Sequence, residues 1–230
     1  PILAIKPKDM VKVVDYTILD PTATVYDVKE VCERAREHDL VAVCVNPCFV
    51  PMAVELLKDS SVKVATLIGY PLGASTAKTK AYETKDALKN GAEELEVVVS
   101  TGLIKDEQWG RIEEDLRPVL EATKVSGITK DIITKAVLET YYLEEQEIKQ
   151  ITELIKDVGL DFIKVGTGFG PEPEPDTEDV GLIRKIVGRG IGVETYGGVK
   201  DFEDAITMLD AGANRIGTSY AIEVVTSDEE

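Results

Sequence analysis

The sequence predicts a single α/β domain of the (β/α)8 class, the TIM barrel. Three observations predict it. The chain has 230 residues, the usual length of one such barrel. Eight strand-like runs alternate with amphipathic helical segments, which favours parallel strands joined by right-handed crossovers and closed into a barrel. We find no linker, low-complexity tract or shift in composition that would divide the chain, so residues 1–230 are expected to form one domain.

The expected strands are short apolar runs, each followed by a turn or loop. In chain order they cover residues 13–19, 41–46, 63–69, 94–99, 133–139, 161–164, 192–195 and 215–218. Helices are expected between them. Residues 1–12 are expected to form a short N-terminal lead-in, and residues 226–230 a disordered tail.

The sequence also marks helix ends. Thr24 precedes Asp27 by three residues, a variant of the capping box that begins a helix. Gly91, Gly159 and Gly212 each stand shortly before an expected strand, where a glycine commonly ends the preceding helix. This recurrence is typical of repeated helix-to-strand units.

The charge of the chain limits its partners. Lysine and arginine total 26 against 43 aspartate and glutamate, so the formal net charge is −17. A surface of this charge repels nucleic acid and anionic membranes, and we expect neither as a partner. Because this overall charge does not attract anions, a phosphate group on a small-molecule substrate would have to be held by contacts within its own binding site. The sequence leaves open whether the chain forms homo-oligomers.

The three cysteines and the single histidine limit the kinds of disulfide, metal and catalytic site that the chain can form. Cys32, Cys44 and Cys48 lack metal-site spacing and lie in apolar or strand-edge contexts, which argues against a disulfide framework. The sequence shows no secretory leader, lipidation signal or apolar stretch of about twenty residues, so a cytoplasmic location is expected. Because His38 is the only histidine, a histidine triad or multi-histidine metal site is excluded. We expect no metal or cofactor, and catalysis by lysine, carboxylate or tyrosine.

Lys164 is the foremost candidate for a reactive group. It ends the apolar run 161–164 and precedes the glycine-rich segment 165–170, so its amine is expected where a buried strand opens into a loop. Apolar surroundings disfavour the ammonium form, and a neutral amine attacks a carbonyl to form a Schiff base. The alternative is a lysine that extends from the strand end to the surface.

Further polar residues are expected beside Lys164, because the C-terminal ends of all strands in a parallel barrel share one face. They are Asp15, Asp20, Asn46, Glu96, Lys135, Glu139 and Glu194. Glu96 alternates with apolar neighbours and should point into the barrel. Lys135 and Glu139, four residues apart, should share one side of the fifth strand. The sequence therefore predicts a site of lysines and carboxylates.

Glycines after the last three strands predict a phosphate site. Backbone amides can approach an anion closely at glycine, and barrels often bind phosphate in the loops after strands seven and eight. The candidate residues are Gly168, Gly197, Gly198, Gly217, Thr218 and Ser219.

Seven ordered motifs, spread over about residues 11–225, resemble those of one enzyme family. They are VDYTIL (14–19), VCVNP (43–47), IGYPLG (68–73), KAVLET (135–140), DFIK (161–164), GGV (197–199) and RIGTS (215–219). The set resembles the 2-deoxyribose-5-phosphate aldolases. This resemblance implies a (β/α)8 barrel and a class I, metal-independent aldolase. Such an enzyme reversibly cleaves deoxyribose 5-phosphate to glyceraldehyde 3-phosphate and acetaldehyde.

The resemblance also implies roles for single residues. Lys164 matches the Schiff-base lysine, and Lys135 matches a second active-site lysine. Glu96 stands where the family has an aspartate of its proton relay. The glycine loops match the loops that hold the substrate phosphate.

Some positions depart from the family pattern. Where members read Val-Lys-Ala-Ser-Gly-Gly, this chain reads Val-Glu-Thr-Tyr-Gly-Gly, so Glu194 replaces a lysine. Tyr16 replaces a frequent histidine, and Asp20 a frequent lysine. A carboxylate near Lys164 stabilises its ammonium form, whereas a cation would lower its pKa. Each unit of upward pKa shift removes about tenfold of the reactive amine.

Three functions remain open from the sequence. The first is an aldolase that acts through Lys164, with Glu96 and Lys135 moving protons. The second is an isomerase or another proton-abstracting enzyme, in which Glu96 and Glu194 form an acid–base pair and Lys164 is ion-paired to Glu194. The third is a barrel that binds a ligand, or nothing, without catalysis.

Overall fold

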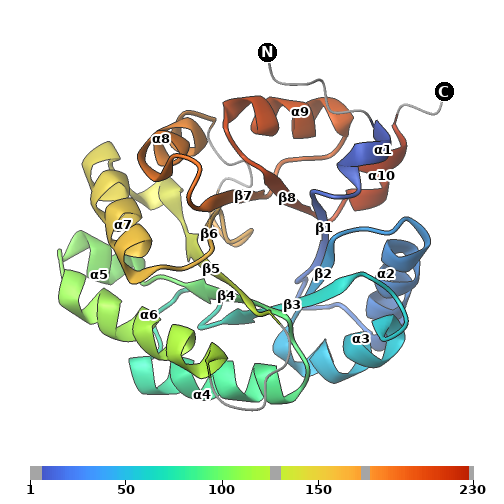
Figure 1. Ribbon diagram of the computed structural model, residues 1–230, viewed down its shortest axis with the longest axis horizontal. Coiled ribbons are helices and arrows are strands. Elements are labelled where there is room, and N and C mark those ends of the chain that lie inside the picture. The colour runs from blue at the N-terminus through green and yellow to red at the C-terminus, as the bar shows by residue number, and fades with distance from the viewer. Residues whose placement is uncertain (1–6, 125–130, 172–176, 228–230) are drawn as a thin grey trace.

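The computed structural model describes residues 7–124, 131–171 and 177–227. Eight parallel strands form a closed barrel in sequence order, and β8 pairs with β1 to complete it (Figure 1). The strands are β1 (Val14–Ile18), β2 (Ala42–Val45), β3 (Lys63–Ile68), β4 (Glu94–Val98), β5 (Ile133–Leu138), β6 (Phe162–Val165), β7 (Gly192–Tyr196) and β8 (Arg215–Thr218). The predicted (β/α)8 class is confirmed, and each predicted strand overlaps an observed one.

Helices surround the barrel (Figure 1). They are α1 (Pro7–Met10), α2 (Val25–Glu37), α3 (Val50–Leu57), α4 (Ala77–Lys89), α5 (Thr101–Lys105), α6 (Trp109–Thr123), α7 (Glu145–Val158), α8 (Thr177–Val187), α9 (Phe202–Ala211) and α10 (Ala221–Thr226), with 3-10 turns η1 (Pro47–Phe49) and η2 (Thr140–Tyr142). None of the helices in the described ranges combines the length and apolarity that a membrane span needs.

The chain ends differ in part from expectation. The N-terminal lead-in contains the short helix α1. The expected tail at 226–230 is wrong for its first two residues, because α10 includes Thr226 and its C-cap is Ser227. Residues 1–6 and 228–230 lie outside the described residues.

The helix ends follow the predicted signals. The Thr24 hydroxyl accepts a hydrogen bond from the Asp27 amide, and the Asp27 carboxylate accepts one from the Thr24 amide, which forms a full capping box at the start of α2. Gly91, Gly159 and Gly212 follow α4, α7 and α9 with φ angles of 98°, 92° and 122°. Glycine adopts these positive values without a steric penalty, so each helix stops and the chain turns towards the next strand.

Side-chain alternation along the strands divides the interior into two environments. The outward faces carry buried apolar residues that pack against the helices. Inside the barrel, β2 and β3 contribute the small or apolar residues Cys44, Ala65 and Leu67. The other six strands place charged side chains in the interior. They are Asp15, Glu94, Glu96, Lys135, Lys164, Glu194 and Arg215, all 5% exposed or less.

Candidate active site

Lys164 lies inside the barrel between two carboxylates. Its Nζ is 2.8 Å from Glu96 Oε2, to which it donates a hydrogen bond. It is also 2.8 Å from Glu194 Oε1, an ion pair without hydrogen-bond geometry. The pairing of β6 with β7 places Lys164 directly opposite Glu194. Lys164 is 1% exposed, so it does not extend to the surface.

Lys135 is the centre of the charged interior. Its Nζ lies 2.6 Å from Glu194 Oε2, 2.9 Å from Glu94 Oε2, 3.0 Å from Asp15 Oδ2 and 3.2 Å from Glu96 Oε1. Glu96 and Glu194 therefore each bridge the two lysines, with one oxygen on each ammonium. The four residues predicted as catalytic are together in one connected network.

Arg215 and Glu94 extend this network, although neither was expected at the site; Arg215 begins the RIGTS motif, and Glu94 lies outside all seven motifs. Arg215 donates hydrogen bonds through Nε to Asp15 Oδ1 at 2.8 Å and through Nη2 to both oxygens of Glu94. A signal for Glu94 is present in the sequence, because the alternation that turns Glu96 inward also turns Glu94 inward two residues earlier. The signal for Arg215 is weaker, since an arginine at a strand start commonly faces solvent.

The network sets the protonation of its members. Burial alone would lower the pKa of Lys164, but the Glu194 and Glu96 carboxylates outweigh it and raise that pKa well above 10.5. Burial alone would raise the pKa of Glu194, but Lys135 and Lys164 hold it far below 4.5. At neutral pH both lysines of the network are ammonium ions in this arrangement.

One carboxyl group is in excess, since four carboxylates face three cations. Burial raises the pKa of Asp15 to about 6, despite the opposing effects of Arg215 and Lys135. Asp15 is therefore the group on which the network takes up a proton first as the pH falls below neutrality.

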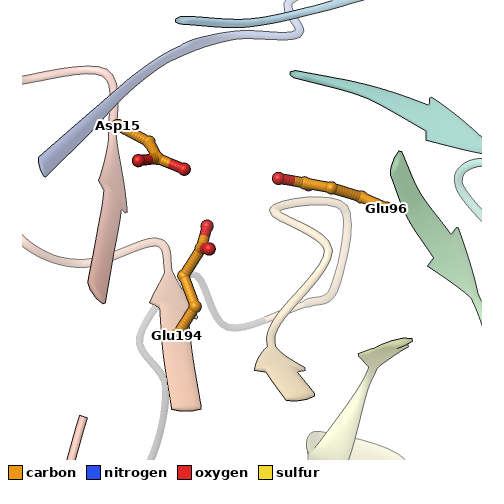
Figure 2. A group of neighbouring side chains, drawn as sticks. All are labelled: Asp15, Glu96 and Glu194. Atoms are coloured by element: carbon orange, nitrogen blue, oxygen red, sulfur yellow. The ribbon is translucent and has the colours of Figure 1, made fainter. Parts of the chain in front are cut away.

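Three carboxylates of the network point towards one another: Asp15, Glu96 and Glu194 (Figure 2). One oxygen from each lies within 4.8 Å of the others, a spacing that a metal ion could use. The Lys135 ammonium, however, is within 3.2 Å of all three side chains. It occupies the place that a cation would take, so the arrangement fits a lysine better than a metal.

A cavity of about 400 Å³ opens at the C-terminal end of the barrel, where the predicted site was expected. Lys164 is not among its lining residues. Tyr196, at the end of β7, lines the cavity, and its ring centroid lies 5.1 Å from Lys164 Nζ. The Tyr196 ring thus forms part of a floor between the cavity and the amine.

The six predicted phosphate-site residues take different positions. Gly168 and Ser219 line the cavity. Gly197 and Gly198 have φ angles of 104° and 71°, which requires glycine in the loop after β7. Gly217 lies over the network, because a Cβ there would be 3.3 Å from Lys164 Nζ.

The sixth residue, Thr218, is used within the protein. Its buried hydroxyl donates to the Val199 carbonyl and accepts a hydrogen bond from the Tyr220 amide. It therefore ties the loop after β8 to the loop after β7.

The remaining polar candidates separate from the network. Asp20 lines the cavity, where Thr22 donates two hydrogen bonds to its carboxylate. Asn46 is the N-cap residue of η1. The expectation that Glu139 shares one side of a strand with Lys135 is wrong, because β5 ends at Leu138 and Glu139 instead accepts a hydrogen bond from the Thr167 amide at 3.1 Å.

Comparisons with known proteins agree on one family. Residues 9–222 match the model of the DeoC/LacD family aldolases. The chain is 44% identical over 217 residues to a deoxyribose-phosphate aldolase of Caldanaerobacter subterraneus. The aligned residues cover 94% of this chain and 92% of that protein. It is 40% identical over 222 residues to one of Aciduliprofundum boonei, with 96% and 98% covered.

Two solved structures have similar folds. One is an aldolase named QR15, with a TM-score of 0.88, 35% identity and 95% coverage of each chain. The other is a deoxyribose phosphate aldolase from Aeropyrum pernix, described as having a unique tetrameric structure, with a TM-score of 0.88, 26% identity and coverage of 98% of this chain and 93% of that one.

Proposed function

Because this chain belongs to the DeoC/LacD family of aldolases, we propose that it is a Schiff-base aldolase that reversibly cleaves deoxyribose 5-phosphate to glyceraldehyde 3-phosphate and acetaldehyde. The observation that carries the proposal is the Lys164 amine, held inside the barrel by Glu96 and Glu194. The names of the relatives supply the substrate. Breakdown of a sugar phosphate is the metabolic role that follows.

In the cleavage direction the Lys164 amine attacks the C1 aldehyde, and loss of water gives an imine. Removal of the C3 hydroxyl proton then breaks the C2–C3 bond, which releases glyceraldehyde 3-phosphate and leaves an enamine of acetaldehyde. Protonation and hydrolysis of this enamine free acetaldehyde and the amine. Glu96 touches both Lys164 and Lys135, at 2.8 and 3.2 Å, so it can pass protons between them.

Trapping of the imine tests this proposal. Acetaldehyde and borohydride should add mass to the peptide that contains residues 161–168, because reduction fixes the imine on Lys164. The yield should rise with pH, since the pKa of Lys164 lies above 10.5 and more amine is neutral in alkali. Lys164→Met, which retains Lys135 and Lys80, should show no specific adduct. The absence of any adduct under saturating aldehyde would remove the aldolase mechanism, and an adduct on Lys135 instead would remove Lys164 as its nucleophile.

Access to Lys164 is expected to depend on Tyr196. Tyr196→Ser should speed imine formation several-fold, because the ring at 5.1 Å from Nζ is replaced by a small side chain that opens the cavity to the amine. The measurement is the initial rate of borohydride trapping. Tyr82→Ser is the matched control, since Tyr82 is 73% exposed on α4. Equal rates for Tyr196→Ser and the unmodified protein would show that the ring is not the barrier.

One observation also fits the acid–base alternative, in which Lys164 is ion-paired to Glu194: the two atoms are 2.8 Å apart. The same trapping experiment separates the two functions, because an acid–base enzyme needs no imine.

A cytoplasmic location and assembly into a homo-oligomer complete the proposal. The free cysteines Cys32, Cys44 and Cys48 and the tetramer described for the Aeropyrum pernix enzyme support them.

A further inference from the structure

A short loop that follows the strand of the reactive lysine forms part of the cavity wall. This β6 loop covers residues 166–170, and two of them, Gly168 and Phe169, line the cavity. Gly166, Gly168 and Gly170 alternate along it, and the first two have φ angles of 91° and 73°. A segment so rich in glycine can adopt many conformations, so contacts with the rest of the protein must hold it in one.

Thr167 is the residue through which the β6 loop is held. It is buried, and its amide donates a hydrogen bond to Glu139 Oε2 at 3.1 Å. Its hydroxyl donates to the same oxygen and accepts a hydrogen bond from the Phe169 amide at 3.0 Å. Its carbonyl accepts one from the Tyr70 hydroxyl at 3.1 Å. The backbone and the side chain of Thr167 therefore both link the loop to its surroundings.

Glu139 is the charged partner in these contacts. It follows β5 directly, and the Gly166 amide donates to the Leu138 carbonyl at 2.8 Å, so the pairing of β5 with β6 brings the loop to the carboxylate. Hydrogen bonds to a carboxylate are stronger than those between neutral groups. A Cβ added to Gly170 would lie 3.0 Å from the carboxyl carbon, so the far end of the loop also passes close to Glu139.

Glu139 can affect a bound substrate only through the loop. It is not among the described residues that line the cavity, whereas Gly168 and Phe169 are. The loop also supports a second part of the wall, because Gly168 packs so closely against the Tyr196 ring that a Cβ there would clash with it. The shape of the cavity therefore depends on the place of the β6 loop.

We propose that Glu139 is a positioning residue: through Thr167 it holds the β6 loop in the conformation that completes the substrate cavity. This inference rests on the proposed function, which makes the cavity the place where deoxyribose 5-phosphate binds. When only a fraction of the molecules has the binding conformation, the apparent affinity falls by that fraction. Loss of the Glu139 contacts therefore weakens binding. It leaves Lys164 in place, because this residue lies on β6 itself between Glu96 and Glu194.

Glu139→Ala tests the proposal, because it removes both hydrogen bonds from Thr167. KM for deoxyribose 5-phosphate should rise about tenfold, which corresponds to a loop that is in place in about a tenth of the molecules. The value of kcat should change less than KM. Trapping of the Lys164 imine with acetaldehyde and borohydride should be no slower than in the unmodified protein, because acetaldehyde is too small to need the whole cavity.

Glu139→Gln is the conservative variant. The glutamine amide oxygen can accept both hydrogen bonds in place of Oε2, so KM should stay close to that of the unmodified protein. Hydrogen exchange measures the loop without substrate. The amides of Thr167 and Phe169 should exchange faster in Glu139→Ala and change little in Glu139→Gln, because glutamine keeps the acceptor.

A matched control lies at the opposite end of the same two strands. The Asp161 carboxylate, just before β6, accepts hydrogen bonds from the Thr134 amide and hydroxyl, both at 2.8 Å. Asp161→Ala removes the same pair of bonds at the end of the barrel away from the cavity. It should lower the free energy of unfolding as Glu139→Ala does, but leave KM for deoxyribose 5-phosphate unchanged.

The outcomes separate this inference from the proposed function. An unchanged KM in Glu139→Ala, or an equal rise in Asp161→Ala, would overturn the role of Glu139 and leave the aldolase intact. If the unmodified protein neither cleaves deoxyribose 5-phosphate nor forms an imine on Lys164, the proposed function is overturned, and the inference with it. A rise of KM in Glu139→Ala that glutamine prevents and Asp161→Ala does not share would support both.

Discussion

Glu194→Gln should increase imine formation at neutral pH by about tenfold for each unit by which the pKa of Lys164 falls. Burial by itself lowers that pKa, and Glu194 is the foremost of the groups that raise it. Glutamine keeps the shape of the side chain and removes its charge. Well below its pKa, the neutral fraction of an amine increases tenfold for each unit of decrease, which corresponds to about 1.4 kcal/mol. The rate of borohydride trapping against pH measures the shift.

A matched control is available within the same network. Glu94→Gln also removes a buried carboxylate, but Glu94 contacts Lys135 and Arg215, and no contact joins it to Lys164 in the described structure. Its pH profile should therefore stay close to that of the unmodified protein. Glu194→Lys should shift the profile further than Glu194→Gln, because it adds a cation. Superimposable profiles for all these proteins would mean that Glu194 does not set the reactivity of Lys164.

Lys135→Met should destabilise the fold by about 3–5 kcal/mol at neutral pH, the usual cost of removing one partner of a buried ion pair. Four carboxylates lie within 3.2 Å of the Lys135 ammonium, so its loss leaves more than one of them short of a partner. Urea unfolding, read as the free energy of unfolding, measures the loss.

The pH dependence of this variant has a definite sign. Removal of the ammonium raises the pKa values of its carboxylate neighbours, beginning with Asp15, whose pKa is already about 6. A folded-state pKa above the unfolded value costs stability at higher pH and restores it as the pH falls. The deficit of Lys135→Met should therefore be smaller at pH 5 than at pH 8.

Lys80→Met provides the comparison for Lys135→Met. Lys80 is equally buried, but Asp115 is the one carboxylate with which it pairs in the described structure, at 2.7 Å and outside the barrel interior. It should lose less stability. A loss below about 1 kcal/mol for Lys135→Met, within the range of exposed pairs, would show that the ammonium does not hold the network together.

The barrel could be predicted from the sequence because its signals are local. The alternation of apolar runs with capped helices predicts the strands and their parallel order. The alternation of side chains along a single strand predicts that Glu96 points inward. The convergence of Lys164, Lys135 and Glu194 follows from the barrel itself, since parallel strands bring their C-terminal ends to one face.

What the sequence could not predict depends on contacts across the barrel. The pairing of β8 with β1 follows from the predicted closure of the barrel, but the sequence does not show that Arg215, at the start of β8, points inward and binds Asp15. The position of Tyr196 over Lys164 depends on side-chain packing with the loop at Gly168, where an added Cβ would clash with the Tyr196 ring. A motif can contain such a residue, but it does not show where the side chain lies in the folded barrel.

As the chain folds, the site is complete only once β8 has paired with β1. Asp15 and Arg215 are 200 residues apart in sequence, so their contact closes almost the whole chain into one loop, at an entropic cost that local contacts do not carry. Until β8 docks, the gap between β7 and β1 leaves Asp15 and Glu94 without the arginine that binds both. Docking of the last strand therefore both closes the barrel and supplies Arg215 to the charged interior, and a chain truncated before β8 would lack the closure and leave Asp15 and Glu94 without this partner.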